Sequence, residues 1–305
     1  MRIGLSGGAR SVERMIEQAK EAEADGFTSL WYPSAVGGDP LVAMAMMGRE
    51  TERIELGTAV LQTYTSHPVL MANRAASVAA AMGRSGFTLG IGPSHAPVID
   101  DMYGMSYEHP GRHTEEYVKV LAPLLAGEDV AFDGEDFRVR SGGRAAAPEH
   151  DVTLMVSALA PRLLRVAGEL TAGTILWMAN AKAVESHVVP RITAAAEAAG
   201  RPAPRIVAGL PVAVHDDEAE ARETAAGQFA MYGTLPNYQR IIEAGGVSGP
   251  AEAAIVGNEA TVTARIEELF AAGATDVWAA PFPVGDDRSA SRRRTRDLLA
   301  ALAAA

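Results

Sequence analysis

The sequence predicts an α/β fold, namely a (β/α)8 TIM barrel formed by a single domain that spans residues 1–305. Two observations carry this prediction. Eight short apolar segments alternate with longer helical patterns from end to end, and no long polar linker divides the chain. The length allows about 38 residues for each strand–helix unit, against about 31 in a barrel of about 250 residues. An open, doubly wound sheet is the alternative that this alternation leaves.

The predicted strands are apolar almost throughout, as expected for parallel strands that are buried on both faces. They cover residues 2–6, 28–32, 54–60, 87–91, 152–157, 174–177, 205–214 and 276–280. The segments between them have helical spacing, and glycines such as Gly26, Gly173 and Gly273 end several of them. The predicted helices cover residues 12–24, 41–49, 69–82, 115–125, 161–170, 183–199, 218–231, 260–272 and 289–303.

Two stretches hold the residues that a minimal barrel does not need. Residues 128–140 predict a small β-hairpin that turns at Asp133-Gly134. Residues 233–258 carry repeated glycines and two prolines, and they predict an irregular, partly helical insertion before the last helix–strand pair. Both stretches are therefore expected as insertions in one barrel rather than as separate domains.

Charge and composition exclude several classes of function. Lys and Arg number 27 and Asp and Glu 38, so the formal net charge of −11 argues against nucleic-acid and polybasic membrane contacts. No apolar run approaches the ~20 residues of a membrane helix, and no signal-peptide pattern is visible. Cysteine is absent, which excludes disulfides and a cysteine nucleophile. We expect a cytoplasmic protein that acts on a small-molecule substrate.

Two glycine-rich motifs follow predicted strands. Ser6 lies in Gly4-Leu5-Ser6-Gly7-Gly8, which matches the nucleophile elbow of hydrolases, but that elbow follows several strands, so a simple turn is favoured. The segment 90–95 (GIGPSH) begins like a dinucleotide-binding loop, although Pro93 lacks the N–H that a pyrophosphate would use. A loop at the carboxyl end of a barrel strand, where barrels carry their chemistry, is the better interpretation. The histidines form no metal-binding pattern, so no metal site is expected.

Three segments carry a resemblance to a known family: residues 54–64 (IELGTAVLQTY), 66–72 (SHPVLMA) and 87–92 (FTLGIG). Together they resemble the luciferase-like monooxygenases, in particular the branch that uses the deazaflavin coenzyme F420. Residues 26–31, 157–168, 257–259 and 272–276 extend the resemblance over nearly the whole chain. It implies a (β/α)8 barrel with the deazaflavin ring across its carboxyl-terminal mouth, and a homodimer.

The resemblance also implies which residues form the site. A non-prolyl cis peptide between Ala59 and Val60 would form a bulge against one ring face, and small residues before Pro161 would let the backbone approach the cofactor phosphate. The implied cofactor-binding residues are Ser34, Ala59, Val60, Gly92, Pro93, Ser157, Ala158, Leu159, Ala160, Trp177, Met178 and Asn180. Ser6, Tyr64 and His67 are candidates for substrate contact.

The sequence departs from the sugar-phosphate dehydrogenases of this branch. Where those enzymes place an acid and a histidine after the second strand, this chain has Ser34 and Ala35, and where they place a glutamate after the fourth strand it has His95. We therefore do not expect a sugar phosphate as the substrate. We expect the protein to act as an F420-dependent reductase, with His95 handling the proton that accompanies the hydride transfer. Two alternatives stay open: a flavin mononucleotide (FMN) monooxygenase, and a deazaflavin-binding protein without catalytic activity.

Overall fold

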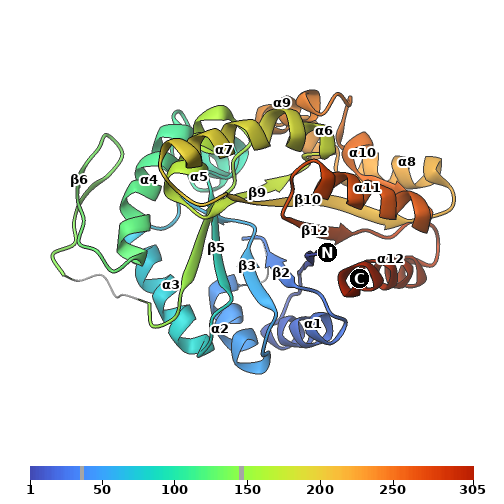
Figure 1. Ribbon diagram of the computed structural model, residues 1–305, viewed down its shortest axis with the longest axis horizontal. Coiled ribbons are helices and arrows are strands. Elements are labelled where there is room, and N and C mark those ends of the chain that lie inside the picture. Colours follow the sequence, from blue (N-terminus) through green and yellow to red (C-terminus); the bar gives the residue numbers. More distant parts are fainter. Residues whose placement is uncertain (35–37, 144–147) are drawn as a thin grey trace.

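The computed structural model describes residues 1–34, 38–143 and 148–305 of the chain, and Ala35 lies outside them. Eight parallel strands form a closed ring in the order β1-β2-β3-β5-β8-β9-β10-β12, and the pairing of β12 with β1 closes it (Figure 1). The strands are β1 (Ile3–Ser6), β2 (Ser29–Tyr32), β3 (Glu55–Thr58), β5 (Phe87–Gly92), β8 (Val152–Val156), β9 (Gly173–Trp177), β10 (Arg205–Val214) and β12 (Asp276–Pro281). The predicted barrel is confirmed, and the open sheet is excluded.

Helices surround this ring (Figure 1). They are α1 (Val12–Ala24), α2 (Pro40–Glu50), α3 (Pro68–Met82), α4 (Pro110–Leu125), α5 (Pro161–Leu170), α6 (Ala181–Ala183), α7 (Val189–Ala198), α8 (Glu218–Gln228), α9 (Pro236–Ala244), α10 (Pro250–Ala253), α11 (Glu259–Ala271) and α12 (Arg288–Ala304). The helices α2 to α5 all begin at a proline, whose missing N–H costs nothing in the first turn. Shorter helical turns are η1 (Pro97–Met102), η2 (Val184–Val188) and η3 (Ala230–Gly233).

Both predicted insertions are present. The strands β6 (Ala131–Asp133) and β7 (Arg138–Arg140) form the antiparallel hairpin, which projects from the barrel in Figure 1. The second insertion contains α9, α10 and a short strand, β11 (Ile255–Gly257), which extends the sheet beside β10. The sequence did not predict β11, nor the two-residue strand β4 (Leu61–Gln62), which pairs with β5.

Two tryptophans fill the interior of the barrel. Trp31 and Trp278 pack with Met155, Ile175 and Val207 in a cluster of their own, inside the ring of strands. Glycines on neighbouring strands make the space for them. A Cβ atom at Gly57 would lie 2.3 Å from the Trp31 ring, and one at Gly209 would lie 2.1 Å from the Trp278 ring. These strand glycines are therefore required by packing, because any side chain would collide with an indole.

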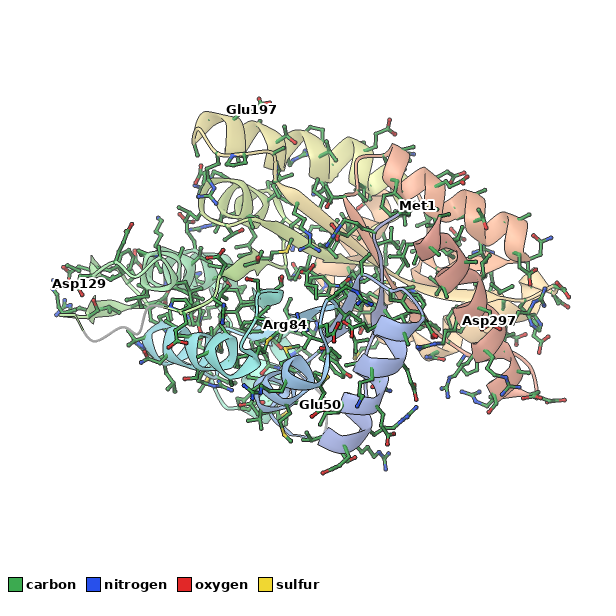
Figure 2. All side chains as sticks on the ribbon, turned by 60° about the horizontal axis from the view of Figure 1, so that its bottom comes forward. Met1, Glu50, Arg84, Asp129, Glu197 and Asp297 are labelled. Carbon is green, nitrogen blue, oxygen red and sulfur yellow. The ribbon has the colours of Figure 1, made fainter. Side chains whose placement is uncertain are left out.

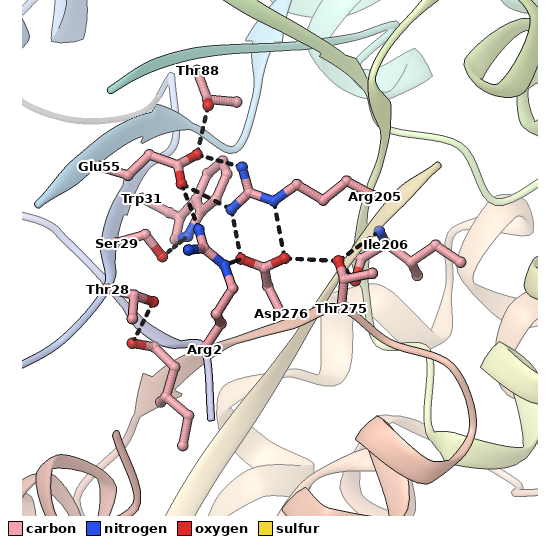
Figure 3. Close-up of polar contacts among 11 residues, drawn as sticks. Arg2, Thr28, Ser29, Trp31, Glu55, Thr88, Arg205, Ile206, Thr275 and Asp276 are labelled. Carbon is pink, nitrogen blue, oxygen red and sulfur yellow. Dashed lines mark hydrogen bonds and ion pairs between the residues drawn. The ribbon is translucent and has the colours of Figure 1, made fainter. Parts of the chain in front are cut away.

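A network of charged side chains closes the amino-terminal end of the barrel (Figure 3). Arg205 lies between the carboxylates of Glu55 and Asp276, and Arg2 binds both carboxylates from the other side. Thr88 donates a hydrogen bond of 2.5 Å to Glu55. Because each buried charge has an opposite charge and hydrogen bonds, the network can lie under the tryptophan layer without leaving an unpaired ion.

Arg84, labelled in Figure 2, lies in the loop between α3 and β5. Its guanidinium donates hydrogen bonds to the carbonyl oxygens of Gly48, Thr51 and Ile54 and to the hydroxyl of Thr51. It thereby binds the end of α2 to the segment that enters β3. The starts of β3 and β5 are therefore held together.

Candidate functional site

A cavity of about 610 Å³ opens at the carboxyl-terminal mouth of the barrel. It is formed by the ends of β1, β5 and β9, by the segments that follow β2, β3 and β8, and by η3 and α9 from the second insertion. Most of the predicted site residues lie in its wall: Ser6, Ser34, Ala59, Val60, Gly92, Pro93, His95, Ser157, Leu159, Ala160 and Trp177. The barrel therefore brings residues from six separate strand ends to one place.

The bulge after β3 forms one side of the cavity. The Ala59–Val60 peptide bond is cis, as the family resemblance implies. The hydroxyl of Thr58 accepts a hydrogen bond from the Gly90 amide (2.8 Å) and donates one to the Gly90 carbonyl (2.7 Å), so β3 is joined to β5 just below the bulge. A Cβ atom at Gly92 would lie 2.9 Å from Val60 and 3.1 Å from Ser157. The absence of a side chain at Gly92 therefore keeps this side of the cavity shallow and open.

Two helix amino termini and one arginine meet at another part of the cavity. The cavity is lined by Pro110 and Gly111 from the first turn of α4 and by Ala160 and Arg162 at the start of α5. Neither helix has a side chain that caps its first turn. Their free N–H groups and the Arg162 guanidinium form a donor set suited to an anion. Arg162 is held by Glu115, whose carboxylate lies 2.7 Å from it.

His95 lies in the cavity wall, in the loop between β5 and η1. Its ring centroid is 5.6 Å from that of Tyr238 on α9. Burial lowers the pKa of His95 below its ordinary value of 6.5. The imidazole is therefore neutral at pH 7, with one nitrogen that accepts a proton and one that donates a hydrogen bond.

Aromatic side chains form the wall opposite the small residues. Trp177 stacks on Trp278 with ring centroids 5.0 Å apart, and Tyr232 meets Tyr238 edge to face at 4.9 Å. The ring centroid of Phe229 lies 6.3 Å from that of Trp177. Sequence reasoning identified only Trp177 among these. Phe229 and Tyr232 lie at the end of α8 and in η3, Tyr238 lies in the second insertion, and Trp278 has the pattern of an ordinary strand residue.

Further cavity residues were not predicted, namely Gln62, Ser94, Arg162, Asn237 and Arg240. Ser94 has a positive φ of 65°, which turns the chain at the carboxyl end of β5. Arg162 follows Pro161 directly, at the start of a helix whose amino terminus was predicted to bind an anion. That prediction was the signal from which Arg162 could have been identified.

Five predicted residues do not line the cavity. Tyr64 stacks on His113 with ring centroids 3.9 Å apart, and His67 caps α3 through the Val69 amide. Ala158 and Met178 are buried. Asn180 caps α6, donates a hydrogen bond to the Gly245 carbonyl and lines a second cavity beside α11. The structure therefore places these five side chains outside the cavity wall.

Within residues 1–34, 38–143 and 148–305, no group of three or more His, Asp or Glu side chains is arranged to hold a metal ion. In the same part of the chain, no helix is both long and apolar enough to cross a membrane.

Comparison with known proteins agrees with the fold. A 5,10-methylenetetrahydromethanopterin reductase from Methanolobus tindarius is 29% identical over 248 residues, which cover 81% of this chain and 75% of that protein. An F420-dependent secondary alcohol dehydrogenase, solved with an F420–acetone adduct, has a TM-score of 0.78 at 18% identity; the match covers 98% of this chain and 97% of that one.

A third protein in this fold uses another cofactor. The oxygenating component of 3,6-diketocamphane monooxygenase from Pseudomonas putida was solved with FMN. It has a TM-score of 0.69 at 18% identity, with 98% of this chain and 97% of that chain covered. The family model described as luciferase-like monooxygenase matches residues 2–290. The chain therefore belongs to the luciferase-like monooxygenase family.

Proposed function

We propose that this protein is an F420-dependent oxidoreductase that works as a reductase on a small organic substrate. The observation that carries the proposal is the 610 Å³ cavity at the barrel mouth, which has a shallow small-residue side and an anion-binding end. The F420-dependent secondary alcohol dehydrogenase, which has this fold, supports F420 as the cofactor, and the similarity to a methanopterin reductase supports a reductase. When bound, the deazaflavin would supply the hydride at its C5 carbon.

The residues of the cavity fit such a cofactor. Ala59, Val60 and Gly92 offer a surface with little side-chain bulk, against which a flat ring can lie. Ser157, Leu159 and Ala160 lead to the start of α5, where free N–H groups and Arg162 can bind the cofactor phosphate. This donor set explains how a protein with a net charge of −11 can bind a polyanion: the positive groups are local.

The protein's own residues have separate tasks in the proposed reaction. Val60 and Trp177 would fix the ring so that the acceptor carbon lies near it, which removes the entropy cost of alignment. His95 would hold or deliver the proton that accompanies the hydride. Ser6 and Ser34 lie in the same wall, where their hydroxyls can bind the polar end of the ring or the substrate.

A cofactor-binding panel tests the proposal. Purified protein is titrated with F420 and with FMN, and binding is followed by the fluorescence of each cofactor. We expect tight binding of F420 and weak binding of FMN. Oxidation of bound, reduced F420 by an added carbonyl acceptor would exclude a protein that only binds the cofactor. The absence of F420 binding would overturn the proposal.

The FMN monooxygenase is the second candidate, and the diketocamphane monooxygenase with its bound FMN is the observation that favours it. In that case FMN would bind more tightly than F420 in the same panel. Reduced FMN on the protein would then consume molecular oxygen, whereas bound reduced F420 would not.

The proposal includes a cytoplasmic homodimer. Val42 and Met46 lie one turn apart on α2, and Leu70 lies on the neighbouring α3; each exposes about half of its surface or more. Apolar side chains on two adjacent helices favour contact with a second copy. Light scattering should give twice the mass of 31.9 kDa, and Met46→Glu should give the monomer. A monomeric wild-type protein would contradict this part.

A further inference from the structure

The cavity is unusual for this acidic chain because it has no acidic lining. The sequence contains 38 Asp and Glu residues, yet none of them lines the cavity among the described residues. The charged side chains in its wall are instead two arginines, Arg162 and Arg240. A carboxylate-free wall with two guanidinium groups favours ligands with negative charge at two places.

The two arginines differ in how far their charge is already balanced. Arg162 is paired with Glu115 at 2.7 Å, and the same carboxylate binds Lys119 and Arg165. Arg240 has no carboxylate partner among the described residues. It donates hydrogen bonds only to neutral oxygens, the Asn237 side-chain oxygen at 2.6 Å and the Pro236 carbonyl at 3.2 Å. Its positive charge is therefore available to a ligand.

Arg240 belongs to a different helix from the proposed phosphate site, which lies at the start of α5. It is on α9, three residues after Asn237, so both side chains lie on one face of that helix. Asn237, Tyr238 and Arg240 all line the cavity, and Tyr238 in turn contacts the ring of His95. The unbalanced charge therefore comes from a different helix than the proposed phosphate site at the start of α5.

The wall beside Arg240 is aromatic. The ring centroids of Tyr238 and Tyr232 are 4.9 Å apart, and those of Tyr232 and Trp177 are 5.8 Å apart. The aromatic rings therefore form a continuous row from α9 to the end of β9. Aromatic faces bind flat, unsaturated bodies well, and one guanidinium matches one unit of negative charge in a planar fork. The two features together describe a flat molecule with a carboxylate at one end.

We propose that the second substrate is an unsaturated or aromatic carboxylic acid and that Arg240 binds its carboxylate, with Asn237 beside it. This inference rests on the proposed function, since it treats the aromatic part of the cavity as the place of the hydride acceptor. Arg240 is then a specificity-determining residue. Its contact with the carboxylate holds the flat body between the aromatic wall and His95.

Two probes of matched shape, benzoate and benzamide, test the assignment. Each is titrated calorimetrically onto the F420-loaded protein and onto the cofactor-free protein at pH 7. We expect benzoate to bind about tenfold more tightly than benzamide, which is what one hydrogen-bonded charge pair provides. Arg240→Met should abolish this preference, and Arg240→Lys should keep part of it. The affinity for F420, measured separately by fluorescence, should be unchanged in both variants.

Arg191→Met is the matched control. Arg191 is also an exposed arginine whose guanidinium donates to a carbonyl one turn back, that of His187, but it does not line the cavity. Its replacement should leave the preference for benzoate intact. Equal binding of the two probes to the wild type, or a preference that survives Arg240→Met, would overturn the inference. A failure to bind F420 would instead contradict the proposed function, and the titration of the cofactor-free protein would still decide the role of Arg240.

Discussion

Arg205 holds Asp276 with a two-point contact: its Nε atom lies 2.9 Å from Oδ2, and its Nη2 atom lies 2.5 Å from Oδ1. The remaining donors reach Glu55 at 2.7 and 2.9 Å. We predict that Arg205→Met lowers the free energy of unfolding by about 3 kcal/mol or more, because it leaves two buried carboxylates with only the half-exposed Arg2 as their counter-ion. Urea denaturation measures the loss. The control is Arg53→Met. The contact of Arg53 with Glu52 is almost fully exposed, so its loss should change the free energy of unfolding by less than about 0.5 kcal/mol.

The lowered pKa of Glu115 predicts that the free energy of unfolding depends on pH. Burial raises the pKa of this carboxyl, but Lys119, Arg162 and Arg165 outweigh burial and lower it from 4.5 to about 2. A lowered native pKa means that the stabilisation is complete above pH 4.5 and is lost as the pH falls towards 2. Glu115→Gln should therefore cost up to about 3 kcal/mol at pH 7 and little at pH 2. A loss of the same size at both pH values in urea denaturation would contradict this account.

Gly209 should not tolerate a side chain. Gly209→Ala would place a methyl group 2.1 Å from the Trp278 indole, inside a closed ring of strands that cannot spread. We expect a loss of about 2 kcal/mol in unfolding free energy and a changed near-ultraviolet signal from the displaced tryptophan. Gly227→Ala in the last turn of α8 is the control, since its Cβ meets nothing within 4 Å. That change should be neutral or stabilising by up to about 1 kcal/mol.

His95 should control the proton of the reaction. Because burial lowers its pKa below 6.5, only a small fraction is protonated at pH 7, and that fraction rises as the pH falls. The rate of substrate reduction should therefore increase by up to about tenfold per unit from pH 8 downwards, until the pKa is reached. His95→Gln should lower kcat by about 10²-fold and remove this slope, with unchanged F420 affinity. Unchanged turnover in that variant would refute the role of His95.

Much of the fold could be predicted because the barrel strands carry a local signal. All eight predicted strands are present, since segments such as 205–214 are apolar over their whole length. β4 and β11 have two and three residues, too few for any periodicity to appear. The apolar spacing predicts a helix only over 115–125, but Pro110, a residue type that commonly opens helices, also indicated the true start of α4.

The candidate site could be predicted only in part. Residues at strand ends, such as Ser6 and Gly92, are placed by the barrel topology itself. The direction of a loop after a strand is a tertiary property, so Tyr64 was expected at the mouth but packs on His113. Arg240 lies in an insertion, whose position over the mouth depends on long-range packing that no local pattern encodes.

The most direct test of the central claim is the affinity for F420 of the wild-type protein and of Gly92→Leu. A leucine there would fill the shallow side of the cavity between Val60 and Ser157, while circular dichroism verifies that the barrel remains folded. The account predicts that the wild type binds F420 in preference to FMN and that Gly92→Leu loses this binding by at least about tenfold. Tighter binding of FMN, or full F420 binding by the folded Gly92→Leu variant, would contradict it.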